Sequence, residues 1–184
     1  MALLGMPNTG KSTLYNRLTG GNAQIANWPG LTVELLRGPM PRDRRGQRYT
    51  LVDLPGLHDL SGSSEDEAIV QRFLRHTPPD LILVVLNASQ VTSQLRLVVQ
   101  LRQLGLPMVV ALNMSDEAFR LGIRIDRRRL AAELGLPLLA ISAKCHQGIH
   151  ELIDVLHQFG ERRYGCGFSG VNAVPAGGAP PAGT

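Results

Sequence analysis

Cysteine is scarce in this sequence, with only Cys145 and Cys166 in a chain of 184 residues. Two cysteines are too few for the disulfide framework of a small secreted domain, so we expect a reducing compartment. Long apolar runs are also missing. None approaches the roughly 20 residues that a membrane-spanning helix needs, and no secretory signal is visible. We therefore expect a cytoplasmic domain without a membrane span of its own.

Lysine is nearly absent, because Lys11 and Lys144 are the only lysines among 19 lysine and arginine residues. Where either cation would serve, the sequence carries arginine, so the two lysines point to specific roles. The net charge is +4, and the arginines form two clusters: Arg42, Arg44, Arg45 and Arg48, and Arg124, Arg127, Arg128 and Arg129. A solvated surface is the simplest interpretation of both clusters, with an anionic membrane surface or RNA as the alternative. Aromatic residues make up only 4% of the chain, which weakens the case for RNA, and we expect no nucleic-acid partner.

Hydrophobic residues make up 43% of the sequence, enough for a sizeable core in one domain. Strand and helix patterns alternate along the chain, which is typical of an α/β fold with a mostly parallel sheet. We expect six strands, at residues 1–4, 32–36, 49–52, 81–86, 107–112 and 137–141. We expect helices at residues 13–18, 65–75, 91–104, 126–134 and 149–159.

Two local signals refine this outline. The short bridge at residues 38–46 predicts an antiparallel hairpin, and hence one antiparallel edge strand, because a parallel connection needs a dozen or more residues. Ser64 and Glu67 have the spacing of a capping box at the start of a helix. Residues 161–184 are rich in glycine, proline and alanine, so we expect a folded domain at residues 1–160 and then a linker or disordered tail.

Residues 5–12 read G-M-P-N-T-G-K-S, the pattern of a phosphate-binding loop, between a predicted strand and a predicted helix. Its glycines let backbone N–H groups converge on a phosphate chain, and the helix dipole favours the same anion. We expect Lys11 to reach the outer phosphates and the Ser12 hydroxyl to bind Mg²⁺. The nucleotide-binding residues predicted in this loop are Gly5, Asn8, Thr9, Gly10, Lys11, Ser12 and Thr13.

A second motif, D-L-P-G at residues 53–56, ends a predicted strand at the sheet edge where α/β proteins bind ligands. Asp53 can hold Mg²⁺ through water, and the Gly56 N–H can approach a γ-phosphate. Thr32, ahead of the edge strand, is where a second Mg²⁺-binding hydroxyl would be needed. Gly30 and Leu31, next to Thr32, belong to the same predicted site.

Two further motifs select the base. N-x-x-D at residues 113–116 follows a predicted strand, and the Asp116 carboxylate can accept hydrogen bonds from the N1–H and exocyclic amine of guanine. Adenine lacks this donor pair, so Asp116 favours guanine. S-A-K at residues 142–144 follows the last strand and can offer backbone donors to the guanine carbonyl. The predicted base-site residues are Asn113, Met114, Asp116, Ser142, Ala143 and Lys144.

These motifs, in this order, resemble a translation-factor-class small GTPase, and more narrowly the amino-terminal G domain of the ferrous iron transport protein B family. The narrower likeness lies in A-N-W-P-G-L-T-V-E (26–34), D-L-P-G-L (53–57) and V-A-L-N-M-S-D-E-A (110–118). It implies a Ras-like P-loop fold with helices on both faces of the sheet, and a slow GTPase that uses GTP, GDP and Mg²⁺. It also implies a place at the cytoplasmic face of the bacterial inner membrane. There the chain would regulate Fe²⁺ uptake by a membrane domain of the same transporter, and an oligomer is possible.

The route of hydrolysis depends on Leu57 and Asn8. Ras-like enzymes orient the attacking water with a glutamine just after the D-x-x-G glycine, but Leu57 stands there and can neither donate nor accept a hydrogen bond. GTPases that resemble this one and carry the loop asparagine bind K⁺ with it, together with backbone carbonyls at residues 24–28. We therefore hypothesise K⁺-stimulated hydrolysis, and ordinary turn chemistry is the alternative for Asn8. The predicted catalytic residues are Asn8, Lys11, Thr32 and Gly56; the predicted metal ligands are Ser12, Thr32 and Asp53 for Mg²⁺ and Asn8 for K⁺.

Two other functions stay open from the sequence. One is a soluble regulatory GTPase for ribosome assembly or tRNA modification. The other is a nucleotide-binding module with little turnover, which Leu57 favours. Met114 favours it too, because GTPases often carry lysine there, and its absence predicts modest affinity. His150 and His157 share a predicted helix face, but they are separated by about two turns, so we expect structural roles for them.

Overall fold

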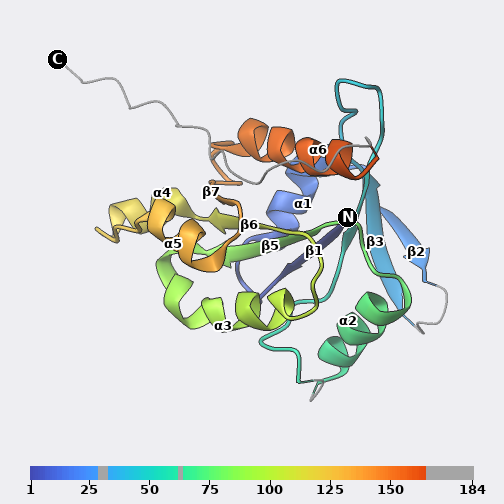
Figure 1. Ribbon diagram of the computed structural model, residues 1–184, viewed down its shortest axis with the longest axis horizontal. Coiled ribbons are helices and arrows are strands. Elements are labelled where there is room, and N and C mark those ends of the chain that lie inside the picture. The colour runs from blue at the N-terminus through green and yellow to red at the C-terminus, as the bar shows by residue number, and fades with distance from the viewer. Residues whose placement is uncertain (29–32, 62–63, 165–184) are drawn as a thin grey trace.

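Among the described residues, seven strands form one sheet in the order β2-β3-β4-β1-β5-β6-β7. The structure is a computed structural model that describes residues 1–28, 33–61 and 64–164, with side chains up to residue 160 (Figure 1). The strands are β1 (Ala2–Gly5), β2 (Gln24–Asn27), β3 (Glu34–Pro39), β4 (Thr50–Asp53), β5 (Ile82–Asn87), β6 (Met108–Asn113) and β7 (Leu138–Ala140). Pairing is parallel from β4 through β1, β5 and β6 to β7. β3 runs antiparallel to both of its neighbours.

The mostly parallel α/β sheet is confirmed, but the expected number of six strands is wrong. The additional strand is β2, which lies at the edge of the sheet and pairs with β3. The antiparallel strand, β3, is therefore second from the edge and is not the edge strand that we expected. β2 reads Q-I-A-N, and its one large apolar side chain, Ile25, is 67% exposed. β2 buries little apolar surface, so its sequence lacks the hydrophobic alternation from which a strand could be predicted. Backbone pairing with β3 holds this strand in place.

From β4 onward, helical segments alternate with single strands as expected. The helices are α1 (Lys11–Thr19), α2 (Glu65–His76), η1 (Ala88–Gln90), α3 (Val91–Arg102), α4 (Ser115–Arg120), α5 (Arg127–Leu134) and α6 (Ile149–Tyr164). The capping box at the start of α2 is confirmed, since Ser64 accepts from the Glu67 N–H and Glu67 accepts from the Ser64 N–H. α6 continues past its expected end at residue 159. The short helix α4 was not predicted, because six residues carry too little periodicity.

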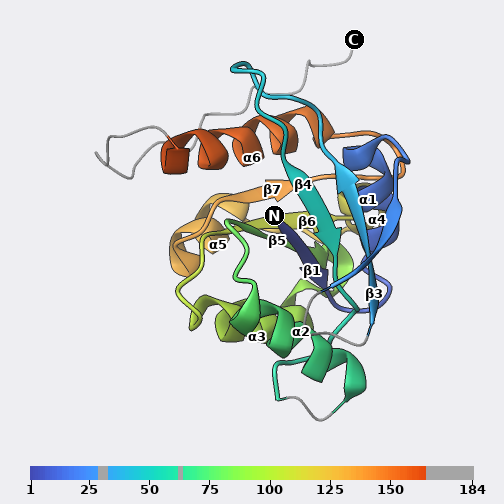
Figure 2. The ribbon, with the colours of Figure 1, turned by 90° about the vertical axis from the view of Figure 1, so that its right-hand side faces the viewer.

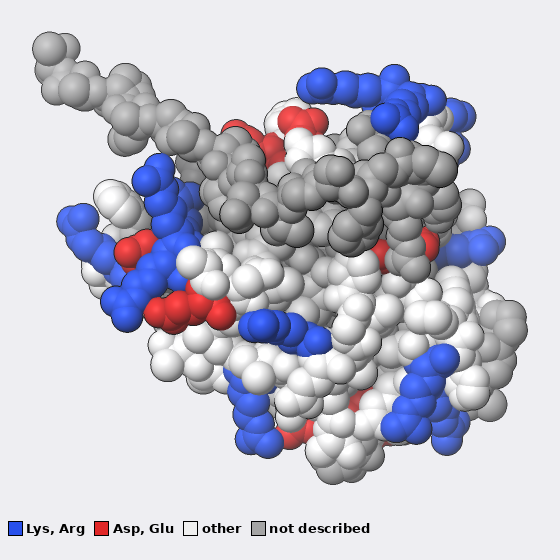
Figure 3. Space-filling view, in the orientation of Figure 1, with Lys and Arg blue, Asp and Glu red and all other residues white. Residues whose placement is uncertain are grey.

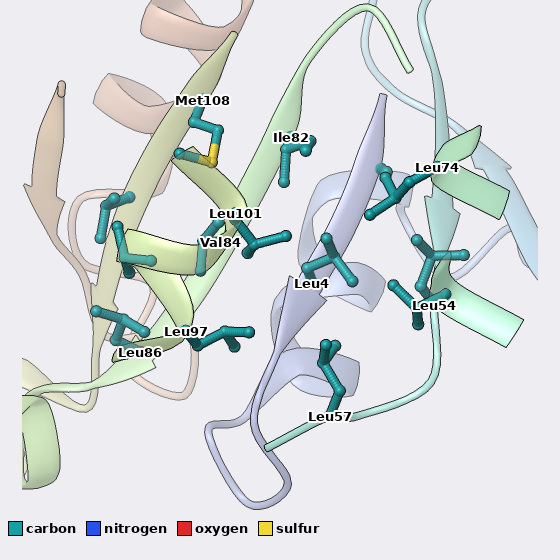
Figure 4. Close-up of a cluster of buried hydrophobic side chains, with 14 of the residues drawn as sticks. Leu4, Leu54, Leu57, Leu74, Ile82, Val84, Leu86, Leu97, Leu101 and Met108 are labelled. Carbon is teal, nitrogen blue, oxygen red and sulfur yellow. The ribbon is translucent and has the colours of Figure 1, made fainter. Parts of the chain in front are cut away.

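The two faces of the sheet carry separate cores, and β5 shows why. Its side chains alternate, so Ile82, Val84 and Leu86 pack with α2 and α3 on one face (Figure 4). Leu83 and Val85 pack with α1 and α6 on the other face. A parallel strand covered on both sides is apolar throughout, as the sequence of β5 is. The resulting arrangement is the expected three-layer fold (Figures 1 and 2).

β1 lies between β4 and β5 in the sheet. The chain connections on the two sides of β1 therefore diverge at its carboxyl end. In open α/β sheets this switch point forms a crevice for ligands. The predicted phosphate-binding loop follows β1, D-L-P-G begins at the end of β4, and N-x-x-D begins at the end of β6. The fold therefore brings the predicted motifs to one edge of the sheet. No helix within the described part of the chain is long and apolar enough to cross a membrane.

Candidate functional site

The loop between β1 and α1 turns sharply through two residues with left-handed backbone conformation. Asn8 has φ 61° and Gly10 has φ 77°. The Thr9 side chain is fully buried, and its hydroxyl donates a 2.9 Å hydrogen bond to Met6 O within the loop. At the start of the loop, a Cβ on Gly5 would lie 2.6 Å from Val85 O, so only glycine lets β1 approach β5 this closely there. The loop thus has a defined shape and leads into the N-terminus of α1, where the first backbone N–H groups have no partner within the helix.

Lys11, the first residue of α1, forms an ion pair with Asp53 at the end of β4. Both side chains are largely buried, with exposures of 13% for Lys11 and 10% for Asp53. Burial raises the pKa of Asp53, and the nearby positive charge of Lys11 only partly offsets this effect. The residues predicted to hold the phosphates and Mg²⁺ are therefore adjacent, and each satisfies the charge of the other.

The D-L-P-G segment lies against the phosphate-binding loop. The Leu57 N–H donates a 3.2 Å hydrogen bond to Gly5 O, and a Cβ on Gly56 would lie 3.4 Å from the backbone nitrogen of Pro7. The Leu57 side chain points into the core and is 1% exposed (Figure 4). Burial thus adds a second reason why this position cannot orient a water molecule at the sheet edge.

Asn113, at the end of β6, joins two of the predicted motifs. Its Nδ2 donates a 2.8 Å hydrogen bond to Thr9 O, and its Oδ1 accepts a 2.9 Å hydrogen bond from the Ala143 N–H. The residue is 2% exposed. The side-chain amide of Asn113 therefore positions the phosphate-binding loop and the S-A-K loop relative to each other.

Asp116, in the first turn of α4, is held by several hydrogen-bond donors. The Ser142 hydroxyl is the main cause that lowers the pKa of Asp116; burial opposes it, and Cys145 and Arg120 lower the pKa further. The Cys145 thiol donates to Asp116 Oδ2 across 3.6 Å, and Arg120 Nη2 lies 3.4 Å from the same oxygen. The carboxylate is therefore ionised at neutral pH and can accept two hydrogen bonds.

Met114 precedes α4 with φ 60°, a left-handed conformation that begins the helix abruptly after β6. The next residue, Ser115, forms two hydrogen bonds with the residue that follows β7. Its N–H and its hydroxyl both donate to Ile141 O, at 3.1 Å and 2.8 Å. These bonds place N-x-x-D beside S-A-K.

A family model described as Ferrous iron transport protein B matches residues 1–156. The chain belongs to this family. Among curated relatives, the Fe(2+) transporter FeoB of Synechocystis sp. is 50% identical over 156 residues, which are 85% of this chain and 25% of the relative. The Fe(2+) transporter FeoB of Escherichia coli is 40% identical over 156 residues, 83% of this chain and 20% of the relative. The chain thus spans about a quarter or less of the length of these two relatives.

Solved structures of the family share the fold. The cytosolic domain of L. pneumophila FeoB has a TM-score of 0.79 and 39% identity, over 86% of this chain and 62% of that one. A mutant of S. thermophilus NFeoB, described as bound to GDP, has a TM-score of 0.75 and 35% identity, over 83% and 59% of the two chains. The cytosolic domain of T. maritima FeoB in a GMPPNP form has a TM-score of 0.75 and 34% identity, over 85% and 62%.

Several predicted residues are placed apart from these contacts. Ser12, Thr13 and Lys144 are exposed around the same sheet edge. Gly30, Leu31 and Thr32 lie outside the described residues. Trp28 packs against α2, where its ring centroid is 5.1 Å from that of Phe73 and its Nε1 donates to Thr77 Oγ1 at 3.1 Å.

Sequence reasoning missed Cys145 as a contact of Asp116. The place of Cys145 directly after S-A-K is the signal that could have found this contact. His157 contacts the β3–β4 hairpin, since its Nε2 lies 3.1 Å from Pro41 O.

Proposed function

We propose that the chain binds guanine nucleotides, hydrolyses GTP to GDP and phosphate, and acts as the nucleotide switch of a ferrous iron transporter. The observation that carries the proposal is the Asn113 side chain, which joins the predicted phosphate loop to the predicted base loop. Relatives are named Fe(2+) transporters, and solved structures of the family are described with GDP and in a GMPPNP form. Family membership favours this function over a soluble GTPase for ribosome assembly or tRNA modification.

Phosphate binding requires Lys11 to exchange partners. The ion pair with Asp53 neutralises both residues, and a polyphosphate offers Lys11 a more highly charged partner at the N-terminus of α1. Asp53 would then be available to hold the Mg²⁺ that accompanies a nucleotide. The Ser12 hydroxyl, the Asp53 carboxylate and Thr32 are oxygen donors that would suit this hard cation, and Mg²⁺ held by them would supply positive charge that neutralises the phosphates.

Guanine selection rests on Asp116. Its two carboxylate oxygens accept from N1–H and the exocyclic amine of guanine, while backbone N–H groups around Ala143 are donors for the base carbonyl. The thiol of Cys145 lies on the same carboxylate, so the carboxylate is oriented before the base arrives.

Hydrolysis proceeds by attack of water on the γ-phosphorus, with GDP as the leaving group. The buried Leu57 side chain cannot position this water, and the Leu57 N–H is bonded to Gly5 O, so the proposed groups are Gly56 and Thr32. Bound K⁺ would add positive charge at the phosphates, and the Asn8 amide oxygen is its proposed protein ligand. The left-handed backbone of Asn8 is also what turn chemistry alone would produce, so K⁺ needs its own test.

The base proposal is tested with Asp116→Asn. An amide offers one donor and one acceptor, which match the 2-carbonyl and N1–H of xanthine, so GDP affinity should fall at least about tenfold while affinity for xanthosine diphosphate rises. The matched control is Glu117→Gln, which neutralises the adjacent, exposed carboxylate and should leave GDP affinity unchanged. Unaltered GDP affinity in Asp116→Asn, measured by titration calorimetry, would reject guanine recognition by Asp116.

The potassium proposal is tested with Asn8→Gly rather than alanine. Glycine adopts φ 61° without strain and removes only the amide, whereas alanine at this position also carries a backbone penalty. Single-turnover GTP hydrolysis should be faster in KCl than in NaCl for the wild type and equal in both for Asn8→Gly. Equal wild-type rates would contradict the role of K⁺, and no turnover in either salt would favour a binding module.

The place in a transporter is tested on the gene. If the chain is the cytoplasmic part of a membrane transporter, the coding sequence beyond residue 184 should contain several apolar runs of about 20 residues, which would form the membrane domain. A reading frame that closes without such runs would leave a free-standing G domain and remove Fe²⁺ uptake from the proposal.

A further inference from the structure

The connection between β3 and β4 carries four exposed arginines on seven consecutive residues: Arg42, Arg44, Arg45 and Arg48. Figure 2 shows this connection rising beyond the sheet beside α6. In the space-filling view, a group of basic side chains stands out at the place where Figure 1 draws the hairpin (Figure 3). We call residues 40–49 the arginine hairpin.

The single acid of the hairpin points inward and, among the described ion pairs, forms none with these arginines. Asp43 is 7% exposed, and its Oδ1 accepts hydrogen bonds from the N–H groups of Arg45 (2.9 Å) and Gln47 (2.8 Å). Its Oδ2 accepts a 2.8 Å bond from the Tyr49 hydroxyl. Among the described ion pairs, none involves an arginine of the hairpin. The outer surface of the tip is therefore positive only.

The hairpin has a fixed shape. The Met40 N–H bonds Tyr49 O at 2.8 Å, and Arg42 Nη1 bonds Gly46 O at 2.7 Å across the tip. At its base the Tyr49 ring stacks on His157 of α6, with centroids 5.6 Å apart. Because the backbone is already ordered, docking the tip costs little loop entropy.

The second arginine cluster, around α5, differs in this respect. Arg129 Nε lies 2.9 Å from Glu133 Oε1, so part of its charge is compensated on the same helix. The two clusters each contain four exposed arginines, which makes the α5 cluster a matched control in charge.

We propose that the arginine hairpin docks on anionic phospholipid headgroups at the membrane surface. A projecting, rigid and wholly positive tip fits a flat anionic surface, where each basic residue adds attraction. It suits RNA less well, because the one aromatic ring of the hairpin, Tyr49, lies at its base, stacked on His157, and is not presented to bases. The membrane location in this proposal rests on the proposed function of the chain in a membrane transporter. The positive charge of the tip does not depend on nucleotide binding.

The test is co-sedimentation of the chain with vesicles of phosphatidylcholine containing 30% phosphatidylserine. The wild type should bind these vesicles and not pure phosphatidylcholine, and binding should weaken as salt rises. The quadruple variant Arg42→Gln, Arg44→Gln, Arg45→Gln, Arg48→Gln should lose at least about tenfold in vesicle affinity. The corresponding four lysine substitutions should retain binding, since charge is what the lipid surface attracts.

The control is the quadruple glutamine variant of Arg124, Arg127, Arg128 and Arg129, which removes the same charge from the cluster around α5 and should keep vesicle binding within about twofold. Equal loss in both glutamine variants, or no wild-type binding to the anionic vesicles, would overturn the proposal. The proposal would also be overturned if the glutamine variant of the hairpin lost binding to a single-stranded RNA probe but kept its binding to vesicles. GDP affinity is measured on every variant. GDP affinity should be the same in all variants. If neither the wild type nor any variant binds GDP, this result counts against the proposed function, and the vesicle result still decides the docking.

Discussion

Asn113 and Thr9 are 104 residues apart in sequence, yet Asn113 Nδ2 donates a 2.8 Å hydrogen bond to Thr9 O. The same side chain accepts from the Ala143 N–H. One buried amide at the end of β6 thereby holds two loops that surround the candidate nucleotide site. The geometry of the phosphate-binding loop thus depends on a residue outside that loop.

Asn113→Ala should both destabilise the fold and weaken nucleotide binding. Thr9 O and the Ala143 N–H each lose their partner, and a buried unsatisfied group costs about 1–3 kcal/mol. We expect the free energy of unfolding to fall by about 2–4 kcal/mol and GDP affinity to fall at least about tenfold. Urea denaturation and calorimetric titration measure the two effects.

The matched control for Asn113 is Asn87→Ala. Asn87 lies opposite Asn113 in the parallel register and bonds the N–H and hydroxyl of Ser89 at the end of β5. This control should also lose stability but keep GDP affinity. If both variants lose affinity equally, the bridge to Thr9 has no special role.

Lys11 and Asp53 allow a test that depends on magnesium. In Asp53→Asn the partner that competes for Lys11 loses its charge, so we expect GDP affinity without Mg²⁺ to rise severalfold, by roughly 1 kcal/mol. With Mg²⁺ present, affinity should instead fall, because the carboxylate is a proposed ligand. The control Asp59→Asn removes an acid that pairs only loosely with Arg96, at 3.9 Å, and should change neither affinity. Equal changes with and without Mg²⁺ would contradict the prediction.

Leu57→Gln should not create a faster GTPase, although Ras-like enzymes carry glutamine at this position. Leu57 is 1% exposed in the core, so a glutamine must either bury its amide or distort the loop. We expect a loss of about 2–4 kcal/mol in unfolding free energy and no gain in single-turnover rate. Leu57→Met conserves volume and should cost less than about 1.5 kcal/mol. A rate increase in Leu57→Gln would show that the side chain can leave the core.

Asp43 makes the acid stability of the domain testable. Burial alone would raise the pKa of Asp43, but hydrogen bonds from the Tyr49 hydroxyl and from the Gln47 and Arg45 N–H groups, with the charge of His157, lower it overall. An aspartate with a lowered pKa stabilises the fold above its ordinary value of about 3.9, and this contribution is lost as the pH falls through the lowered pKa.

Tyr49→Phe removes one of these donors, so the pKa of Asp43 should move up toward the ordinary value. The thermal midpoint of the variant should therefore decline less steeply than that of the wild type as the pH falls below about 4. Asp43→Asn serves as the limiting case, because it has no carboxyl to titrate. Identical pH profiles for all three proteins would show that Asp43 is not the group responsible.

Much of the site follows from local sequence patterns. The sequence predicts Lys11 at the phosphates and Asp53 at Mg²⁺, because each belongs to a short motif next to a strand end. Parallel strands bring their carboxyl ends to one edge, so motifs at strand ends must converge wherever the strands are neighbours. The capping box of Ser64 and Glu67 was predictable for the same reason, since all its contacts lie within one helical turn.

Other features have no local signal. β2 buries almost nothing, and only its pairing with β3 makes it a strand. α4 is too short for periodicity. The inward turn of Asp43 depends on Tyr49 and on the support of α6, so the sequence alone showed a cluster of arginines but not that their acid neighbour is withdrawn.

The sequence by itself therefore determined which chemical groups stand at the ends of the strands, because those groups are encoded within a few consecutive residues. Only the tertiary structure decided how they are held. Leu57 is removed from the site by core packing, and Asn113 joins residues 9 and 143. Contacts between distant segments depend on which polar groups remain unsatisfied once the core has formed, and no local pattern records that.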